Sequence, residues 1–355
     1  MRKLYIACIL GVTLTSSTLC SQGPVASSQS FKLGTFQQDG REFVGAVVDE
    51  SRVIDLAVAN RTLQISQGWS SVDMGSNMIA LIAGYENGLG ERIRQIVATV
   101  PSNAPYLHDL SALDIEPPIK YPRTMLNAAV NYMAHAEETG TTSAMEAAVK
   151  APPSMPGIWE REDGDRRQNP YFFVKPTAAV IGDGDAIKMP PNREMLDWES
   201  ELAVVIGKTA SRVSIEEASD YIFGYTIEHD VSDRNGRPDG RHGSDWLVGK
   251  GHDTFAPMGP FVVPKEFIDD PMDLDLKFTL NDTVMQDSNT RNMIHDIYDL
   301  VHYASNIITL HPGDVLSTGS PAGVGSGRTP PIFMKKGDRA ICWIEGIGTL
   351  TNPIE

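Results

Sequence analysis

The chain has 355 residues, 46 of them acidic and 30 basic, so its formal net charge is −16. With 41% hydrophobic and 21% charged residues its composition is globular, enough for one large domain or two unequal ones. The acidic balance argues against a nucleic-acid partner, which requires a positive surface. No apolar run reaches the roughly 18 residues of a membrane-spanning helix, which argues against stable membrane insertion.

The first thirty residues differ from the rest of the chain. Arg2 and Lys3 precede an apolar run over residues 4–14, and small and polar residues follow. This order is typical of a secretory signal peptide, so we expect residues 1–26 to be removed on export to the periplasm or the exterior. A buried first strand or helix is one alternative. Processing as a lipoprotein through Cys20 is another, although Leu19 stands before it where a small residue is favoured.

Residues 31–115 predict a small N-terminal α+β domain. Two helices are expected, with Asn87 and Gly88 between them, because apolar residues recur there at helical spacing. Strands separated by turn sequences precede them, and proline-rich stretches after them are typical of linkers. The predicted strands cover 31–36, 43–48 and 52–58, the helices 74–85 and 91–100, and the linkers 101–105 and 116–118.

Residues 119–355 are richer in strands and predict the catalytic domain. Strands and helices do not alternate regularly, which favours an α+β fold with a mixed β-roll or barrel-like core over a doubly wound sheet. The irregular stretch 137–170, rich in glycine, proline and charge, is a candidate lid over a substrate. Strands are predicted over 171–175, 202–206, 221–228, 259–263, 274–280 and 340–344, and one helix over 293–308.

Three acidic side chains predict a metal site. Glu199 and Glu201 point to one face of a strand, and a buried pair of like charges requires a cation. Asp230 ends a later strand, and three carboxylates suit Mg²⁺, with Mn²⁺ or Ca²⁺ as alternatives, better than zinc. Glu228, on the same strand face as Asp230, is a weaker alternative ligand. An exposed acidic edge without a metal is the other interpretation.

A second group of residues predicts acid–base and substrate-binding chemistry. His135 and Glu138 are neighbours on a predicted helix, where the carboxylate would orient the imidazole as a general base; an ordinary surface pair is the alternative. Lys250 lies in an apolar, glycine-rich setting, where it would bind a carboxylate or polarise a carbonyl if it is not simply solvated. The loop 317–325 offers backbone N–H groups and hydroxyls to an oxyanion.

These motifs together resemble the fumarylacetoacetate hydrolase family, over about residues 119–353. The matching segments are 131–138, 197–207, 224–232, 250–260, 312–325 and 346–353. The resemblance implies that Glu199, Glu201 and Asp230 bind the divalent metal and that His135 with Glu138 activates water. It implies that Lys250, Tyr132, Arg234 and Ser320 contact the substrate, and that the protein is a homodimer. Arg237 stands where many relatives carry a glutamine, and 237–246 is longer than in short bacterial relatives.

The first functional hypothesis is an exported, Mg²⁺-dependent hydrolase that cleaves a C–C bond in a β-diketo acid of the fumarylacetoacetate or acylpyruvate type. His135 would take a proton from water, the metal would accept the departing enolate, and Lys250 would hold a carboxylate. The alternative is an isomerase or decarboxylase of keto or enol dicarboxylic acids on the same site. A metal-dependent binding protein without turnover is the third hypothesis.

Overall fold

The computed structural model describes residues 29–140, 169–235, 238–239 and 243–355. Several sequence-based expectations lie outside these residues. They concern the signal peptide with Cys20, Arg237 and most of the candidate lid over 137–170.

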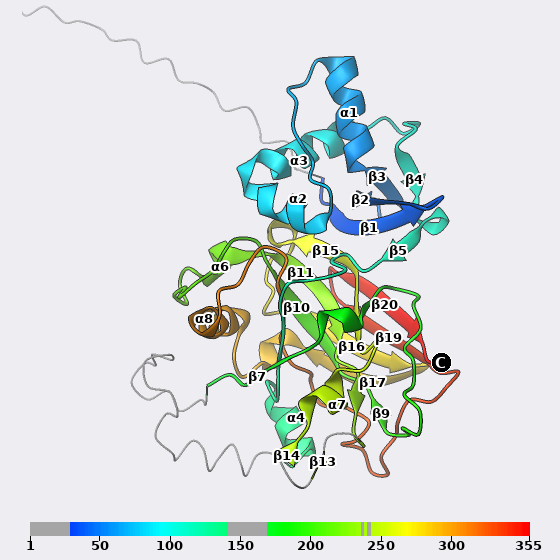
Figure 1. The fold of residues 1–355 in the computed structure, drawn as a ribbon, viewed down its shortest axis with the longest axis vertical. Helices are drawn as coiled ribbons and strands as arrows, with labels where there is room; N and C mark the ends of the chain where they lie inside the picture. Colours follow the sequence, from blue (N-terminus) through cyan, green and yellow to red (C-terminus); the bar gives the residue numbers. More distant parts are fainter. Residues whose placement is uncertain (1–28, 141–168, 236–237, 240–242) are drawn as a thin grey trace, which may run out of the picture.

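One twelve-stranded mixed sheet runs through both the leading and the catalytic part of the chain (Figure 1). Its path begins at β4 and ends at β7, so the sheet is open and does not close into a barrel. The predicted α+β class is confirmed. β5 (Asp114–Glu116) pairs with β1, and β8 (Val180–Ile181) pairs with β15. The strand order is β4 (Leu107–Asp109), β3 (Arg52–Asp55), β2 (Arg41–Val48), β1 (Lys32–Gln38), β15 (Ala256–Pro264), β11 (Ile222–His229), β10 (Ser200–Ile206), β18 (Val315–Ser317), β6 (Met125–Ala128) and β7 (Phe172–Val174).

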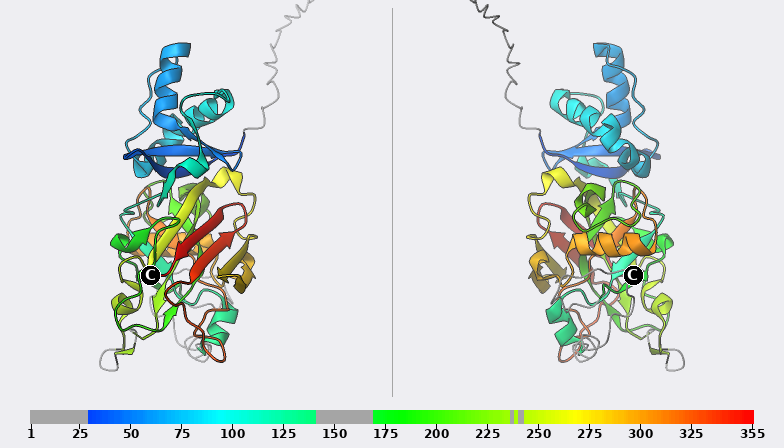
Figure 2. Two further views of the ribbon diagram at one scale, coloured as in Figure 1. Left: turned by 90° about the vertical axis from the view of Figure 1, so that its right-hand side faces the viewer. Right: turned by 90° about the vertical axis from the view of Figure 1, so that its left-hand side faces the viewer.

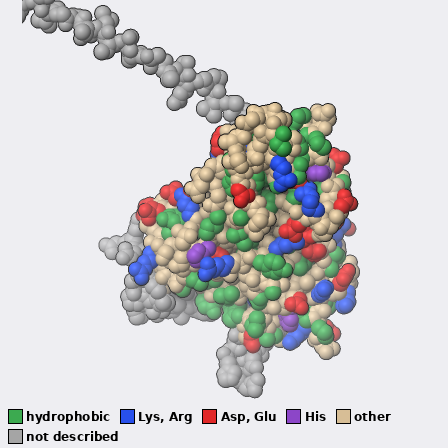
Figure 3. All heavy atoms as spheres, turned by 45° about the horizontal axis from the view of Figure 1, so that its top comes forward, with side chains coloured by type: hydrophobic (Ala, Val, Ile, Leu, Met, Phe, Trp, Pro, Cys, Tyr) green, Lys and Arg blue, Asp and Glu red, His purple; other side chains and the backbone are tan. Residues whose placement is uncertain are grey.

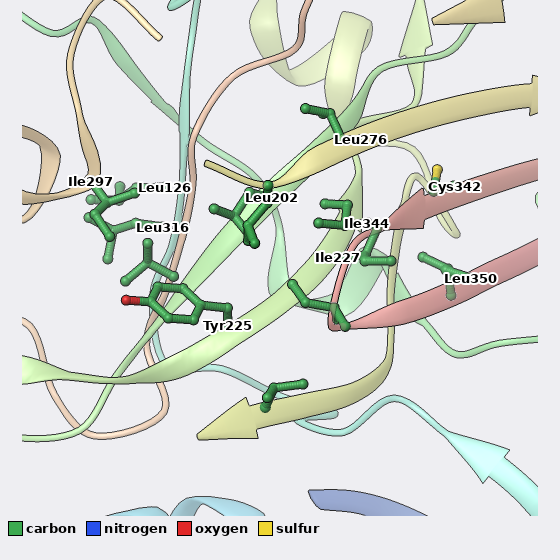
Figure 4. Packing of buried hydrophobic residues seen from close by; sticks show 14 of the residues in the cluster. Leu126, Leu202, Tyr225, Ile227, Leu276, Ile297, Leu316, Cys342, Ile344 and Leu350 are labelled. Atoms are coloured by element: carbon green, nitrogen blue, oxygen red, sulfur yellow. The ribbon is translucent and has the colours of Figure 1, made fainter. Parts of the chain in front are cut away.

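A second, four-stranded antiparallel sheet packs across the catalytic part of the first one (Figure 2). Its order is β17 (Thr283–Asn289), β16 (Asp275–Leu280), β19 (Arg339–Ile344) and β20 (Gly348–Pro353). β16 alternates buried and half-buried residues, as a strand with one face on a core does. Between the sheets, Leu202 and Ile227 of the large sheet meet side chains of the small one, namely Leu276, Ile344 and Leu350 (Figure 4).

The leading part contains elements that the sequence analysis did not predict, among them the helix Leu56–Gln67 and the strands β4 and β5, and predicted elements have different bounds. The strand predicted over 52–58 ends at Asp55, because the Asp55 carboxylate accepts a hydrogen bond from the Val58 N–H and caps helix α1 (Leu56–Gln67). The predicted helix 74–85 begins only at Met78, as α2 (Met78–Gly84), after the Asn77 cap. It continues through the irregular turn η1 (Tyr85–Leu89) into α3 (Gly90–Thr99).

The leading part joins the catalytic part through β1 and β15, which pair antiparallel at Leu33 and Val262. One apolar cluster spans this junction. It contains Leu33 and helix residues of the leading part together with Met258, Val262 and Val315 of the catalytic part. Whether residues 31–115 form a domain of their own stays a prediction.

In the catalytic part each predicted strand corresponds to an observed one, and no end is shifted by more than three residues. The predicted helix 293–308 is α8 (Ile297–Ile307), four residues shorter at its start. Asp296 is its cap, with a carboxylate that accepts from the N–H groups of Tyr298 and Asp299. Met293 instead pairs with Tyr132 in an isolated bridge.

The remaining elements are short and surround the large sheet. Among the described residues no helix combines the length and apolar character needed to cross a membrane. On the face shown in Figure 3, charged and hydrophobic side chains are interspersed. These elements are α4 (Met133–Glu138), α6 (Ala218–Tyr221), α7 (Trp246–Lys250), β9 (Leu196–Asp197), β12 (Ser232–Asp233), β13 (Pro238–Asp239), β14 (Gly243–Ser244), η2 (Leu110–Ala112), η3 (Thr177–Ala179), η4 (Lys265–Phe267) and η5 (Thr290–Asn292).

Candidate active site

The strands β10 and β11 bring three carboxylates together. Glu199 immediately precedes β10, Glu201 lies within it, and Asp230 immediately follows β11. The Asp230 N–H donates to the Glu199 carbonyl oxygen at 2.9 Å, which holds the two strand ends side by side. One oxygen from each of the three carboxylates lies within 4.8 Å of the others, and all three residues are buried.

This donor set fits a hard divalent cation, because carboxylate oxygens are the ligands that Mg²⁺ and Mn²⁺ prefer. Burial raises the pKa of Glu201 well above its usual range, and the negative charges of Asp230, Glu228 and Glu199 raise it further. A bound divalent cation would offset that repulsion.

Glu228, the weaker alternative ligand, lies directly opposite Glu201 on β11 but does not line the cavity described below. Its carboxylate accepts a hydrogen bond from Asn127 at 2.9 Å and lies 3.0 Å from the Ser317 hydroxyl. Burial raises the pKa of Glu228 to about 8. The geometry therefore favours Glu201 over Glu228 as the cation ligand.

Lys250 and Arg234 lie against the carboxylate cluster. Lys250 Nζ is 2.5 Å from one oxygen of Glu199 and also contacts Asp230, and Arg234 Nη2 is 2.5 Å from the other oxygen of Glu199. Burial alone would raise the pKa of Glu199, but Lys250 and Arg234 hold it well below its usual range. Arg234 also donates to Asp197 at 2.8 Å, so its guanidinium fastens the start of β10.

Lys175 is a site residue that the sequence analysis missed. It follows β7, is fully buried, and its ammonium contacts the second oxygen of Asp230 and the Val231 carbonyl. Each oxygen of Asp230 therefore has a lysine partner. The available signal was a lysine directly after the apolar run 171–174 and before Pro176, where a strand side chain is buried.

His135 and Glu138 are in contact on α4. Nδ1 of His135 lies 2.8 Å from one carboxylate oxygen of Glu138, and the other oxygen accepts the Gly323 N–H at 2.8 Å. A carboxylate only accepts, so Nδ1 carries a proton, and in the neutral imidazole Nε2 is the nitrogen with the lone pair. The imidazole is thus oriented by a carboxylate that is itself anchored to the loop 317–325.

The loop 317–325 differs from its expected role. Three of its backbone N–H groups donate to carboxylates of the protein, so for these three the expectation of donation to a substrate oxyanion is wrong. Buried acidic side chains compete for the same donors, because an unpaired buried carboxylate is costly. The pairs are Gly319 with Glu201 at 2.9 Å, Gly323 with Glu138 at 2.8 Å and Gly325 with Asp197 at 2.6 Å.

A cavity of about 100 Å³ joins these groups. Tyr132 does not line it; the Tyr132 hydroxyl is buried and has no hydrogen-bond partner among the described residues. Glu138 stands behind His135 rather than in the wall. The wall is formed by Ala128, Ala129, Val130, His135, Thr139, Phe173, Glu199, Glu201, Asp230, Arg234, Trp246, Lys250 and Ser320.

Two aromatic rings belong to the apolar part of the wall. Phe173 of β7 stacks on Trp246 of α7, with ring centroids 4.8 Å apart. The Lys250 ammonium lies 5.2 Å from the Phe173 centroid, within cation–π range. The cavity thus has a charged half suited to carboxylates and a cation, and an apolar half of limited size.

Comparisons with known proteins identify the family to which a chain with this fold and cavity belongs. A family model described as fumarylacetoacetate (FAA) hydrolase, C-terminal, matches residues 124–355. The chain belongs to the fumarylacetoacetate hydrolase family, which is a family of enzymes. The resemblance stated from the motifs is confirmed.

Similar curated proteins include two oxaloacetate tautomerases. The chain is 32% identical over 329 residues to oxaloacetate tautomerase YisK of Bacillus subtilis, covering 91% of this chain and 99% of that protein. It is 34% identical over 277 residues to a mitochondrial oxaloacetate tautomerase of Rattus norvegicus, covering 78% and 79%. Among solved structures, maleylpyruvate hydrolase from Sphingobium has 30% identity and a TM-score of 0.65, covering 91% and 98%. The same enzyme with manganese(II) and pyruvate has 29% identity and a TM-score of 0.63, again covering 91% and 98%.

Proposed function

We propose that the chain is a divalent-metal-dependent enzyme that interconverts the keto and enol forms of a small β-keto dicarboxylic acid of the oxaloacetate type. One observation carries this proposal. A single cavity is lined by the three-carboxylate cluster, the buried Lys250 and the His135 imidazole, whose Nδ1 contacts the Glu138 carboxylate. The likeness to oxaloacetate tautomerases over nearly the whole of one of them supports the reaction class.

Glu199, Glu201 and Asp230 are the residues that would hold the cation, with Mg²⁺ and Mn²⁺ as the ions that suit them. A divalent ion, when bound, supplies positive charge opposite the oxygens of a keto acid and so favours charge build-up on them.

The chain's own residues then move the proton. The methylene carbon between two carbonyl groups gives a proton to Nε2 of His135, and the C–H electron pair becomes the C=C bond. The carbonyl π electron pair moves to oxygen, which takes the proton back from the His135 imidazolium, so that the enol hydroxyl forms and the imidazole is neutral again. Glu138 stabilises the imidazolium that forms in between, through its contact with Nδ1. Lys250 supplies a buried positive charge for a substrate carboxylate.

The size of the cavity supports a small substrate. A volume of about 100 Å³ is that of about three water molecules in the liquid. A four-carbon keto dicarboxylate is closer to this size than a long diketo acid is.

C–C bond hydrolysis of a β-keto acid is the second candidate function. The same His135–Glu138 pair can take a proton from water instead of carbon. The likeness to maleylpyruvate hydrolase favours this candidate, since 98% of that chain is covered.

The deciding experiment follows the enol absorbance of oxaloacetate with the full chain, after chelation and after addition of Mg²⁺ or Mn²⁺. We expect a metal-dependent acceleration of the approach to the keto–enol equilibrium. Chromatography is expected to show no more pyruvate or other cleavage product than the same metal gives without the protein. Maleylpyruvate and acylpyruvates are tested in parallel. If these compounds gave stoichiometric cleavage products and the tautomerisation of oxaloacetate were not accelerated, the chain would be a hydrolase and not a tautomerase.

Export and dimerisation complete the proposal. We infer that residues 1–26 are a signal peptide, because of the order of charged, apolar and polar residues at the start. Amino-terminal sequencing of the protein from its native host is expected to begin near residue 27, and a sequence beginning at Met1 or Arg2 would refute it. We also infer a homodimer, which light scattering after gel filtration measures directly.

A further inference from the structure

Gln286 is a buried polar residue that does not line the cavity but contacts Ser320, which does. It lies on β17 with 1% of its surface exposed. Its Oε1 accepts the Ser200 N–H at 3.1 Å, at the start of β10. Its Nε2 lies 2.8 Å from the Ser320 hydroxyl oxygen and 2.8 Å from the Pro321 carbonyl oxygen.

The chemistry of these partners fixes the orientation of the Gln286 amide. The Ser200 N–H can only donate, so the amide atom facing it is the oxygen. The Pro321 carbonyl can only accept, so the atom facing it is the nitrogen. Both constraints give the same orientation. The second N–H of Nε2 is then directed to Ser320, whose hydroxyl oxygen accepts it.

The Ser320 hydroxyl can still donate its own proton to an acceptor. Among the described residues it donates to the Pro321 carbonyl at 3.4 Å, a distance at which a hydroxyl hydrogen bond is weak, and this carbonyl already accepts from Gln286. Ser320 lines the cavity that also contains His135 and Lys250. We propose that Gln286 is a positioning residue that fixes Ser320 as a hydrogen-bond donor to a substrate oxygen, an inference that rests on the proposed function.

The partner that this arrangement selects is an oxygen that only accepts. Carbonyl, enolate and carboxylate oxygens meet that condition, and each occurs on a keto acid. Because Gln286 fills one acceptor position of the Ser320 oxygen, the hydroxyl is predisposed to donate rather than to accept.

The test reverses the polarity of residue 286 at constant shape. In Gln286→Glu the carboxylate still accepts the Ser200 N–H, but it offers no N–H to Ser320. The Ser320 hydroxyl is then expected to turn toward the new carboxylate, away from the cavity. Calorimetry of the full chain loaded with Mn²⁺ measures affinity for pyruvate and oxalate. We expect both Ser320→Ala and Gln286→Glu to weaken binding by about ten- to a hundredfold, with unchanged Mn²⁺ affinity.

The double variant distinguishes positioning from a general structural role. If Gln286 acts through Ser320, then Gln286→Glu in the Ser320→Ala background costs little further affinity. Additive losses would overturn the proposal, as would wild-type affinity in Gln286→Glu or in Ser320→Ala. Gln286→Met, which removes the amide without adding a charge, replaces Gln286→Glu if the latter does not fold, and the same non-additivity is expected.

Failure of this inference is separable from failure of the proposed function. A wild-type chain that neither binds pyruvate nor turns over oxaloacetate would refute the proposed function. A wild-type chain that does both, with Gln286→Glu indistinguishable from it, would refute only the role of Gln286. In the active case we expect KM to rise more than kcat falls.

Discussion

Lys175 and Asp230 form an ion pair that excludes water, with side chains 0% and 2% exposed. They directly follow β7 and β11, so the pair connects the carboxylate cluster to the strand at the end of the large sheet. Removing Lys175 leaves one oxygen of Asp230 buried without its cation while Lys250 still pairs with the other, and losing a buried partner is far more costly than losing a surface pair.

We therefore predict that Lys175→Met lowers the free energy of unfolding of the metal-free protein by about 3–5 kcal/mol. The matched control is Lys277→Met, which breaks an exposed pair with Asp287 and is expected to cost about 1 kcal/mol or less. Urea titration in the presence of a chelator measures both. Equal, small losses in the two variants would show that the buried pair does not stabilise the fold.

Substitution at Glu201 tests the metal site. Glu201→Gln is expected to weaken Mn²⁺ binding by more than about a hundredfold, because it removes a charged ligand, whereas loss of a supporting group typically costs about 10–100-fold. Glu228→Gln is the matched control, as its carboxylate lies opposite Glu201 but outside the cavity wall. If calorimetry showed the larger loss of Mn²⁺ affinity in Glu228→Gln, then Glu228 and not Glu201 would be the metal ligand.

The sequence predicted these carboxylates because the information is local. Glu199 and Glu201 precede a run of apolar residues at the two-residue period of a strand, and His135 and Glu138 are three apart, the spacing of helix neighbours. Helix α1 was also locally encoded, through the Asp55 cap, but the apolar residues after it resemble a continuing strand.

Lys175 and Gln286 were not predictable in this way. Lys175 is 55 residues from Asp230, and Gln286 is 34 residues from Ser320. A lone lysine or glutamine in a strand is usually solvated, and only the arrangement of the strands shows that these two are buried beside polar partners. The same holds for the loop 317–325, whose N–H acceptors come from residues up to 185 positions away.

Removal of the imidazole separates acid–base chemistry from metal binding. His135→Ala is expected to keep Mn²⁺ and pyruvate affinity and to lower turnover by about 10²–10⁴-fold, the worth of a positioned general base. Glu138→Gln is expected to lower turnover less, because an amide still contacts the ring but no longer stabilises its protonated form. Steady-state kinetics on oxaloacetate give both values, and wild-type turnover in His135→Ala would remove the histidine from the mechanism.

Cys342 provides a chemical test of the core. It lies between the two sheets, and burial raises the pKa of its thiol to about 12 (Figure 4). Because pH 9 lies about three units below this pKa, about one thiol in a thousand is ionised at that pH. We predict that iodoacetamide leaves Cys342 unmodified in native protein from pH 7 to 9, as measured by peptide mass spectrometry. In guanidinium chloride the same cysteine is expected to react fully, and labelling of the native chain would contradict the packing.

The junction between β1 and β15 has a consequence for how the molecule comes apart. β15 is a nine-residue strand buried throughout, and Met258 and Val262 on it pack into the same apolar cluster as the leading helices. A chain cut before residue 119 would leave this strand with an open, apolar edge, the kind of edge that recruits other chains into aggregates. The leading part thus covers one side of β15, and we expect its loss by proteolysis to promote aggregation before it disturbs the carboxylate cluster.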